Sequence, residues 1–131
     1  MILLDTSILI APPVDLSTTG MGASVISLGE LEFGLAVAES VRERNFRLHR
    51  IIRYSEVLEW ITFEEADARS YGILAARVAP VRARHARSKD ILIAAQALTL
   101  GIPLMTRNEQ DFELVSDLVE IVGPDGLPSP R

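Results

Sequence analysis

The sequence opens with "MILLDTSILI" (residues 1–10), in which an acidic residue, Asp5, interrupts two apolar segments. The apolar residues before it are consecutive instead of alternating with polar ones, which predicts a short β-strand buried on both faces. Asp5 is the last residue of this predicted strand. A buried carboxylate is costly unless it is hydrogen-bonded, paired or bound to a metal ion. The first question is therefore what offsets this cost.

The composition is that of a single soluble domain. The chain has 131 residues, of which 48% are hydrophobic and 24% charged, and it contains no cysteine. A disulfide framework and a thiolate metal site are thus excluded. The apolar start is too short for a signal peptide and lacks a basic segment before it, and no apolar run is long enough to span a membrane. We expect a cytoplasmic protein with one domain over residues 1–122 and a C-terminal tail over 123–131.

The net charge of −5 speaks against a non-specific nucleic-acid binder, but the basic residues are unevenly distributed. Ten of the thirteen Lys and Arg residues lie in two windows, 42–53 and 77–89. Such windows allow an acidic protein to meet a polyanion on one face. The arginines of the first window are interpreted as the solvated face of a helix.

Apolar periodicity predicts short strands that alternate with helices. Strands are expected over residues 2–5, 24–27, 57–63, 103–106 and 119–122. Helices are expected over residues 27–40, 41–57, 64–79 and 90–101, and the Pro/Gly-rich stretch 11–23 is expected to be a loop. This alternation is typical of a parallel sheet covered by helices on both faces.

Two of these helices carry further predictions. In the helix over 27–40, Ser27 is the expected N-cap and Glu30 follows three residues later. The helix over 41–57 is amphipathic, and burial in the core is favoured for its apolar face over a dimer or partner surface. The apolar residues of this face are Val41, Phe46, Leu48, Ile51 and Ile52.

Four acids lie where a parallel sheet gathers its ligands, at the carboxyl ends of strands and at the starts of the following helices. Asp5 ends the first strand and Asp111 lies just beyond the fourth, while Glu30 and Asp90 are each placed in the first turn of a helix. These positions meet at one edge of the sheet, so the four side chains are expected to converge. Singly, each has a simpler explanation: Asp5 and Asp111 as turn or cap residues, Glu30 as a capping partner of Ser27, and Asp90 as an acid at the positive end of a helix.

Converging carboxylates repel one another and require protons or cations. Mg²⁺ and Mn²⁺ suit carboxylate oxygen ligands and keep several waters in their shells. A zinc site is disfavoured, because His49 and His85 both lie in the basic windows and not beside the acids. A divalent cation would neutralise Asp5 and so offset the cost of burying its carboxylate.

Three blocks carry a family resemblance: "LLDTSIL" (3–9), "SLGELEFGL" (27–35) and "SKDILIAAQALTLGIPLMTRNEQDF" (88–112). In this order they resemble the PIN-domain family, and within it the toxin ribonucleases of VapBC-type toxin–antitoxin modules. The resemblance extends over residues 2–122, and the third block is its most specific part. It implies a three-layer α/β/α domain around a central, mainly parallel sheet of about five strands, with an acidic metal site that cuts single-stranded RNA.

The resemblance also implies roles for individual residues. Its four catalytic acids fall on Asp5, Glu30, Asp90 and Asp111, while Glu32 does not match. Three of them, Asp5, Asp90 and Asp111, would hold Mg²⁺ or Mn²⁺ directly or through water, and Glu30 is either a ligand or the group that orients the attacking water. The supporting polar residues are Ser7, Thr106 and Asn108.

Further expectations concern partners. The basic segment before Asp90 offers contacts to RNA phosphates, with a solvated loop as the equal alternative; its candidates are Arg82, Arg84, Arg87 and Lys89. The family implies an antitoxin that covers the acidic site, and a homodimer. One departure is that a Pro/Gly-rich stretch follows Asp5 where such toxins carry a helix and more chain, so the first helix is expected to be shortened or missing.

Three other functions are alternatives for this sequence. A phosphatase of the haloacid dehalogenase type would need a second aspartate two residues after the first, where this chain has Ser7. A receiver domain would need an aspartate after the third strand, which "VLEWITFEE" (57–65) does not supply. A catalytically silent PIN-like binding module is the main alternative, although the presence of all four acids argues against it.

Overall fold

A five-stranded sheet forms the centre of the computed structural model, which describes residues 1–12 and 20–126. The strand order is β3-β2-β1-β4-β5, and every neighbouring pair is parallel. The strands are β1 (Ile2–Leu4), β2 (Met21–Ser24), β3 (Glu59–Ile61), β4 (Leu104–Met105) and β5 (Ile121–Val122). The predicted parallel sheet of about five strands is confirmed.

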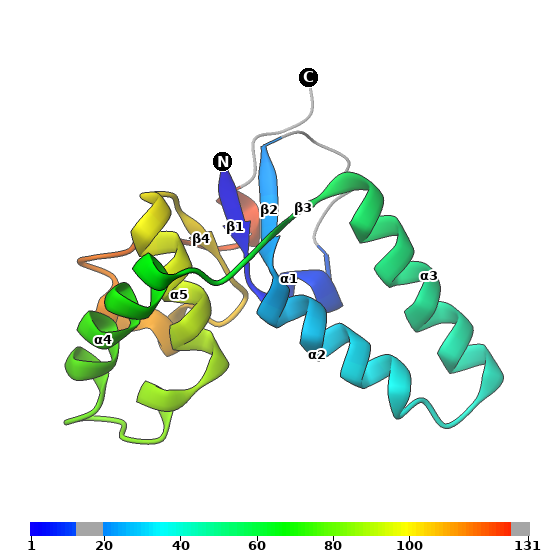
Figure 1. Ribbon diagram of the computed structural model, residues 1–131, viewed down its shortest axis with the longest axis horizontal. Coiled ribbons are helices and arrows are strands. Elements are labelled where there is room, and N and C mark those ends of the chain that lie inside the picture. The colour runs from blue at the N-terminus through cyan, green and yellow to red at the C-terminus, as the bar shows by residue number, and fades with distance from the viewer. Residues whose placement is uncertain (13–19, 127–131) are drawn as a thin grey trace.

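Helices cover both faces of this sheet (Figure 1). One side carries α4 and α5, and the other carries α2 and α3, so the predicted three-layer α/β/α architecture is confirmed. The helices are α1 (Thr6–Ile10), α2 (Val25–Ala36), α3 (Val41–Val57), α4 (Glu65–Val78) and α5 (Lys89–Leu100), with short 3₁₀ segments η1 (His85–Arg87), η2 (Glu109–Val115) and η3 (Pro124–Gly126). Within the described residues, no helix is both long and apolar enough to cross a membrane.

The apolar start of the chain lies between two hydrophobic clusters. Leu3 and Leu4 are both fully buried, but successive residues of a strand point to opposite faces. Leu3 belongs to the cluster formed with α4 and α5, and Leu4 to the cluster formed with α1, α2 and α3. This explains why β1 needs consecutive apolar residues and confirms its predicted burial on both faces.

The second strand and the helix after it begin earlier than predicted. The strand covers Met21–Ser24 instead of 24–27, so part of the expected loop 11–23 is strand; its residues 13–19 lie outside the described chain. Gly22 permits this close packing, because a Cβ on it would lie 2.9 Å from Cδ1 of Ile61. The Oγ of Ser24 accepts a hydrogen bond from the Ile26 N–H (3.0 Å), so Ser24, and not Ser27, caps α2.

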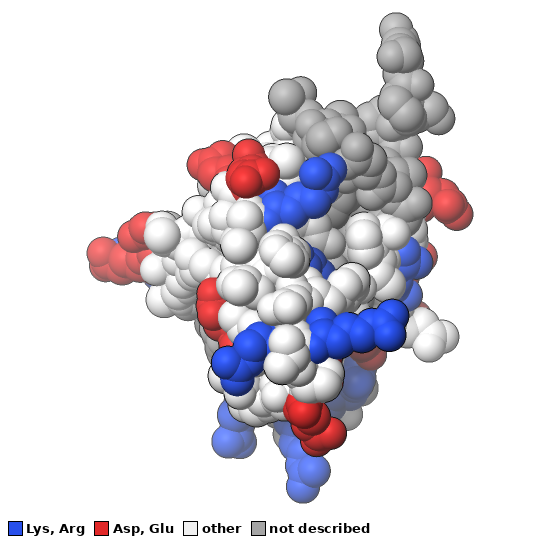
Figure 2. All heavy atoms as spheres, turned by 90° about the vertical axis from the view of Figure 1, so that its right-hand side faces the viewer, with Lys and Arg blue, Asp and Glu red and all other residues white. Residues whose placement is uncertain are grey.

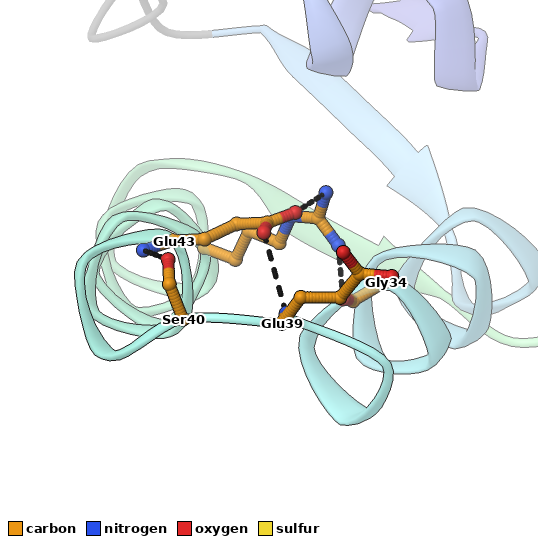
Figure 3. Close-up of polar contacts among 5 residues, drawn as sticks. Gly34, Glu39, Ser40 and Glu43 are labelled. Carbon is orange, nitrogen blue, oxygen red and sulfur yellow. Dashed lines mark hydrogen bonds and ion pairs between the residues drawn. The ribbon is translucent and has the colours of Figure 1, made fainter.

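A short polar network fixes the connection between α2 and α3 (Figure 3). The Glu43 N–H donates to Oγ of Ser40 (3.0 Å), which caps α3, and the Glu39 N–H donates to the Glu43 carboxylate (3.3 Å). Arg47 contacts both Glu43 and the carbonyl oxygen of Gly34 at the end of α2. The two helices therefore form a hairpin with a defined geometry.

The predicted bounds of α3 are correct. The predicted burial of its apolar face is wrong, however, for four of the five apolar residues on which it was based. Only Ile51 lies in the core; Tyr54 and Leu58 supply the rest of the buried contact. Figure 2 shows the face of the molecule on this side, where Lys and Arg side chains are separated by uncharged surface. The exposed apolar side chains are Val41, Phe46, Leu48 and Ile52. The small first helix explains this, because α1 covers little of a 17-residue partner.

Removal of one buried hydroxyl group on α3 should loosen its contact with α1. The Tyr54 hydroxyl donates to the Leu9 carbonyl oxygen (2.6 Å), and both residues are buried. We expect Tyr54→Phe to lower the free energy of unfolding by about 1–2 kcal/mol, measured by urea denaturation. Tyr71→Phe on α4 serves as the control, with an expected change within about 0.5 kcal/mol. An equal loss in both variants would contradict this role of the hydroxyl.

Candidate active site

The predicted acids gather around the point where the strand order reverses. From the central strand β1, the chain adds β2 on one side and β4 on the other. Asp5 follows β1, and Thr106 follows β4, so both lie at the carboxyl edge between neighbouring strands. Ligands of open α/β sheets bind in the crevice at such a switch point.

Hydroxyl groups hold one oxygen of the Asp5 carboxylate. Oδ2 accepts hydrogen bonds from Ser7 Oγ (2.8 Å) and Thr106 Oγ1 (2.9 Å), and Asp5 is only 3% exposed. The second oxygen, Oδ1, is buried and has no hydrogen-bond partner. The first oxygen is therefore fixed by the protein, and the second is directed to a buried position that nothing in the described chain satisfies.

The two predicted supporting residues around Asp5 also bind the loop after β4. Ser7 Oγ accepts from the Arg107 N–H (3.0 Å), and Thr106 Oγ1 accepts from the Asn108 N–H (3.0 Å). Ser7 and Thr106 thus occupy the supporting positions predicted for them. Asn108 takes part through its backbone, and its side chain is exposed.

A second chain of hydroxyl groups holds Glu30. Thr6 Oγ1 donates to Oε1 of Glu30 (3.0 Å) and lies 2.8 Å from Oγ of the buried Ser27. Glu30 lies in the second turn of α2, because that helix begins at Val25, so its assignment to the first turn is wrong, as is the capping partnership with Ser27. Thr6 and Ser27 were not predicted as site residues. Glu32 is exposed, in agreement with its exclusion from the site.

Asp90 experiences the charge of the other three acids. Burial is the main cause that raises the pKa of Asp90 to about 6; the negative charges of Asp5, Asp111 and Glu30 add to it, and His85 partly opposes them. This carboxylate lies in the first turn of α5, as predicted. The structure therefore brings the four predicted acids into one electrostatically coupled group.

Two residues of the basic segment hold Asp111. His85 Nε2 lies 2.6 Å from the Asp111 carbonyl oxygen, and an Arg82 guanidinium nitrogen lies 3.6 Å from Oδ1 of its carboxylate. Of the four predicted phosphate contacts, Arg82 therefore faces an acid of the site, while Arg84, Arg87 and Lys89 are exposed. The contact made by His85 was missed, since a histidine in a basic window gives no sign of the carbonyl group it reaches.

The donor chemistry of the site suits a hard divalent cation. All four groups offer carboxylate oxygens, Oδ1 of Asp5 has no partner, and burial together with the neighbouring negative charges raises the pKa of Asp90. Over residues 1–12 and 20–126, however, no three Asp, Glu or His side chains are arranged as a ready set of metal ligands. Mg²⁺ retains several waters, so these residues fit a partly hydrated ion held in part through water.

The raised pKa gives the metal-free protein a defined pH dependence. The unfolded pKa of an aspartate is about 3.9, so between about pH 4 and pH 6 the native state binds more protons than the unfolded state. The free energy of unfolding should therefore fall as pH rises through this window. In EDTA we expect Asp90→Asn to stabilise the protein by about 1–2 kcal/mol at pH 7.5, after allowance for partial exposure, and by much less at pH 4.5.

Urea denaturation at the two pH values measures this difference. Glu32→Gln, an exposed acid on α2, is the control and should show no such dependence. If Asp90→Asn raises the free energy of unfolding equally at pH 4.5 and pH 7.5, the pKa of Asp90 is not raised in the native state.

Fold and site together define an α/β/α protein with a cluster of carboxylates at the switch point of its sheet. No protein-family model and no curated protein sequence matches the chain. Solved structures do match it. A chain of VapBC-5 from Mycobacterium tuberculosis, a member of the VapBC family of toxin–antitoxin systems, has a TM-score of 0.73 at 25% identity, over 92% of this chain and 94% of that chain.

Two further matches are similar in extent. DNA-bound VapBC from Salmonella typhimurium gives a TM-score of 0.75 at 22% identity, over 94% of this chain and 97% of that one. FitAcB from Neisseria gonorrhoeae gives a TM-score of 0.70 at 23% identity, over 97% of this chain and 100% of that chain. The chain thus has the fold of chains found in VapBC toxin–antitoxin complexes, and the resemblance identified from its sequence blocks is confirmed at this level.

Proposed function

We propose that this chain is the toxin of a toxin–antitoxin module and acts as a Mg²⁺- or Mn²⁺-dependent endoribonuclease. The observation that carries this proposal is the buried Asp5, whose unpartnered Oδ1 lies at the switch point of the sheet among three coupled carboxylates. The similarity to VapBC structures over nearly the whole chain supports it.

Hydrolysis of a phosphodiester bond requires an activated water, relief of charge on the phosphoryl oxygens and a stabilised leaving oxygen. A divalent cation held at this site would supply these by lowering the pKa of its water and acting as a Lewis acid. Asp5, Asp90 and Asp111 are the residues that would hold the ion. Ser7 and Thr106 fix the orientation of Asp5, and Thr6 fixes Glu30 where its carboxylate can orient the attacking water.

The same proposal includes a protein partner. One of the solved structures that share this fold is described as a member of the VapBC family of toxin–antitoxin systems, and the VapBC structure from Salmonella typhimurium is described as bound to DNA. We therefore propose a cognate antitoxin that covers the acidic site of this chain. The homodimer implied by the resemblance remains a prediction, for which Val41 and Ile52, two exposed apolar residues of α3 outside the cleft wall, are candidate contacts.

Incubation with total cellular RNA tests the nuclease. Purified protein, freed of any bound antitoxin, is expected to make discrete cuts with Mg²⁺ or Mn²⁺ and none with EDTA, and mapping of the new ends identifies the target. Intact RNA in the presence of folded protein and metal would favour the silent binding module. Release of phosphate from small phosphate esters would favour the phosphatase, although Ser7, bonded to Asp5, occupies the position where that class needs its second acid.

The exposed arginines beside the site should contribute to RNA affinity through phosphates. We expect Arg84→Ala and Arg87→Ala each to reduce the slope of log affinity against log salt concentration by about 0.7, the value for one phosphate contact on single strands. Binding is measured in EDTA by fluorescence anisotropy with a labelled single-stranded RNA. Arg42→Ala, an exposed arginine on α3, is the control with the same charge change. An unchanged slope would assign these two arginines to a solvated loop.

A further inference from the structure

A cleft of about 400 Å³ opens between α1, α2 and α3 and continues from the acidic site. Thr6 and Glu30, which belong to the hydrogen-bonded chain of that site, form part of its wall. Phe46 and Arg50 of α3 line the opposite wall. The volume lies within the range of small-molecule sites, about 300–1,000 Å³, so the cleft has room for a ligand beside the acids.

The α3 wall presents a stacked pair with an unsatisfied donor. The guanidinium carbon of Arg50 lies 5.8 Å from the centroid of the Phe46 ring, and Phe46 is 65% exposed. The ring thus contributes little to the core. Nε of Arg50 is buried and has no hydrogen-bond partner. A buried N–H group without an acceptor is unfavourable, and a ligand carrying an acceptor atom would relieve it.

The remaining charges of the cleft favour a neutral ligand over an anionic one. Glu30 and Glu43 line it together with two arginines, of which Arg47 contacts Glu43 and the Gly34 carbonyl and so holds the walls together. Formal charges in the lining are therefore balanced. A phosphate group placed here would lie between two carboxylates, whereas an uncharged aromatic ring with acceptor atoms on its edge meets no such repulsion.

We propose that this cleft binds one base of the RNA substrate, adjacent to the bond that is cleaved. The base stacks on the ring of Phe46 beside Arg50, so that Nε–H of Arg50 can donate in the plane of the guanidinium group to an acceptor on the base edge. Aromatic rings and arginine planes are the side chains that bind unstacked bases of single-stranded RNA. This inference rests on the proposed nuclease function and names the residues that would set its sequence preference.

Cleavage kinetics test the proposal with two variants and two matched controls on the same helix. Phe46→Ala and Arg50→Gln alter the cleft, while Leu48→Ala and Arg44→Gln alter exposed positions outside its lining. We expect Phe46→Ala to raise KM about 10-fold with a smaller change in kcat, since loss of one stacked base weakens binding about 5- to 150-fold. Both cleft variants should also lose the base preference at one position beside the cut.

A binding measurement separates this inference from the nuclease proposal. In EDTA, a labelled random-sequence RNA octamer should bind Phe46→Ala about 10-fold more weakly than it binds wild type or Leu48→Ala. Cleavage by all variants with unchanged KM, base preference and RNA affinity would overturn the base site and leave the nuclease intact. RNA that is bound through Phe46 but never cut would overturn the nuclease and retain the base site, and absence of RNA binding by the wild type would overturn both.

Discussion

Asp90→Ala is expected to lower the rate of Mg²⁺-dependent RNA cleavage by about 1,000-fold or more while the protein remains folded. Loss of a residue that only hydrogen-bonds to a metal ligand already reduces metal affinity or activity by about 10–100-fold. Asp90 is proposed as a ligand itself, so a larger effect is expected. Its carboxylate experiences the charge of the other three acids, so its removal takes away part of the field that would concentrate a cation. The rate is measured on the mapped RNA target at saturating metal.

Two comparisons make this result specific to the site. Glu32→Ala removes an exposed acid from α2 and should leave the rate unchanged, whereas Glu30→Ala, two residues earlier, should abolish most of it. Thr106→Val removes a hydroxyl that holds Asp5 Oδ2 and should cost about 10–100-fold. Titration with Mn²⁺, followed by electron paramagnetic resonance, should show weaker binding in Asp90→Ala; equal cleavage by this variant and wild type would contradict the proposed site.

The largest expected effect on stability comes from the residue that follows Asp111. Phe112 is 1% exposed and belongs to the hydrophobic cluster on the α4–α5 side of the sheet. We expect Phe112→Ala to lower the free energy of unfolding by about 3–5 kcal/mol, because it loses apolar burial and leaves a cavity. Urea denaturation measures the loss. A stability close to that of wild type would show that the cluster collapses around the cavity.

A matched substitution at the surface separates burial from residue type. Phe33→Ala on α2 removes the same ring from a position that is 68% exposed, and we expect a change within about 0.5 kcal/mol. Phe112→Leu keeps most of the buried volume and should cost less than Phe112→Ala. Because η2 carries both Phe112 and Asp111, the alanine variant should also lose activity at temperatures where it is still folded.

Sequence patterns predicted the fold where a segment is long or uniformly apolar. The bounds of α3 were correct, and α4 and α5 each differ by one residue at either end from the ranges expected. The pattern failed at β2, where Gly22 and Ala23 are typical of a loop. The small size of Gly22 instead suits the neighbouring strand, since Ile61 approaches it closely. Such a requirement depends on the partner strand and is not encoded locally.

The candidate site, like the fold, was predictable from the sequence only in part. The positions of Asp5, Asp90 and Asp111 followed from strand ends and helix starts, whereas Glu30 lies one turn further into its helix than expected. Ser7 and Thr106 followed from the family resemblance. The link from Ser27 through Thr6 to Glu30 was not predictable, because Ser27 was taken for the cap of that helix. The exposure of Phe46 on α3 was missed for a related reason, since an amphipathic pattern does not reveal how little chain is available to cover it.

The order in which the sheet is assembled has a consequence for biosynthesis. The central strand is synthesised before the other four strands of its sheet, yet β4, which pairs with it, and Thr106, which donates a hydrogen bond to the Asp5 carboxylate, follow about one hundred residues later. Asp5 therefore acquires its final surroundings only after β4 and Thr106 have been translated. For a chain with the proposed activity, an incomplete nascent polypeptide would carry no assembled centre and would spare the messenger from which it is being made.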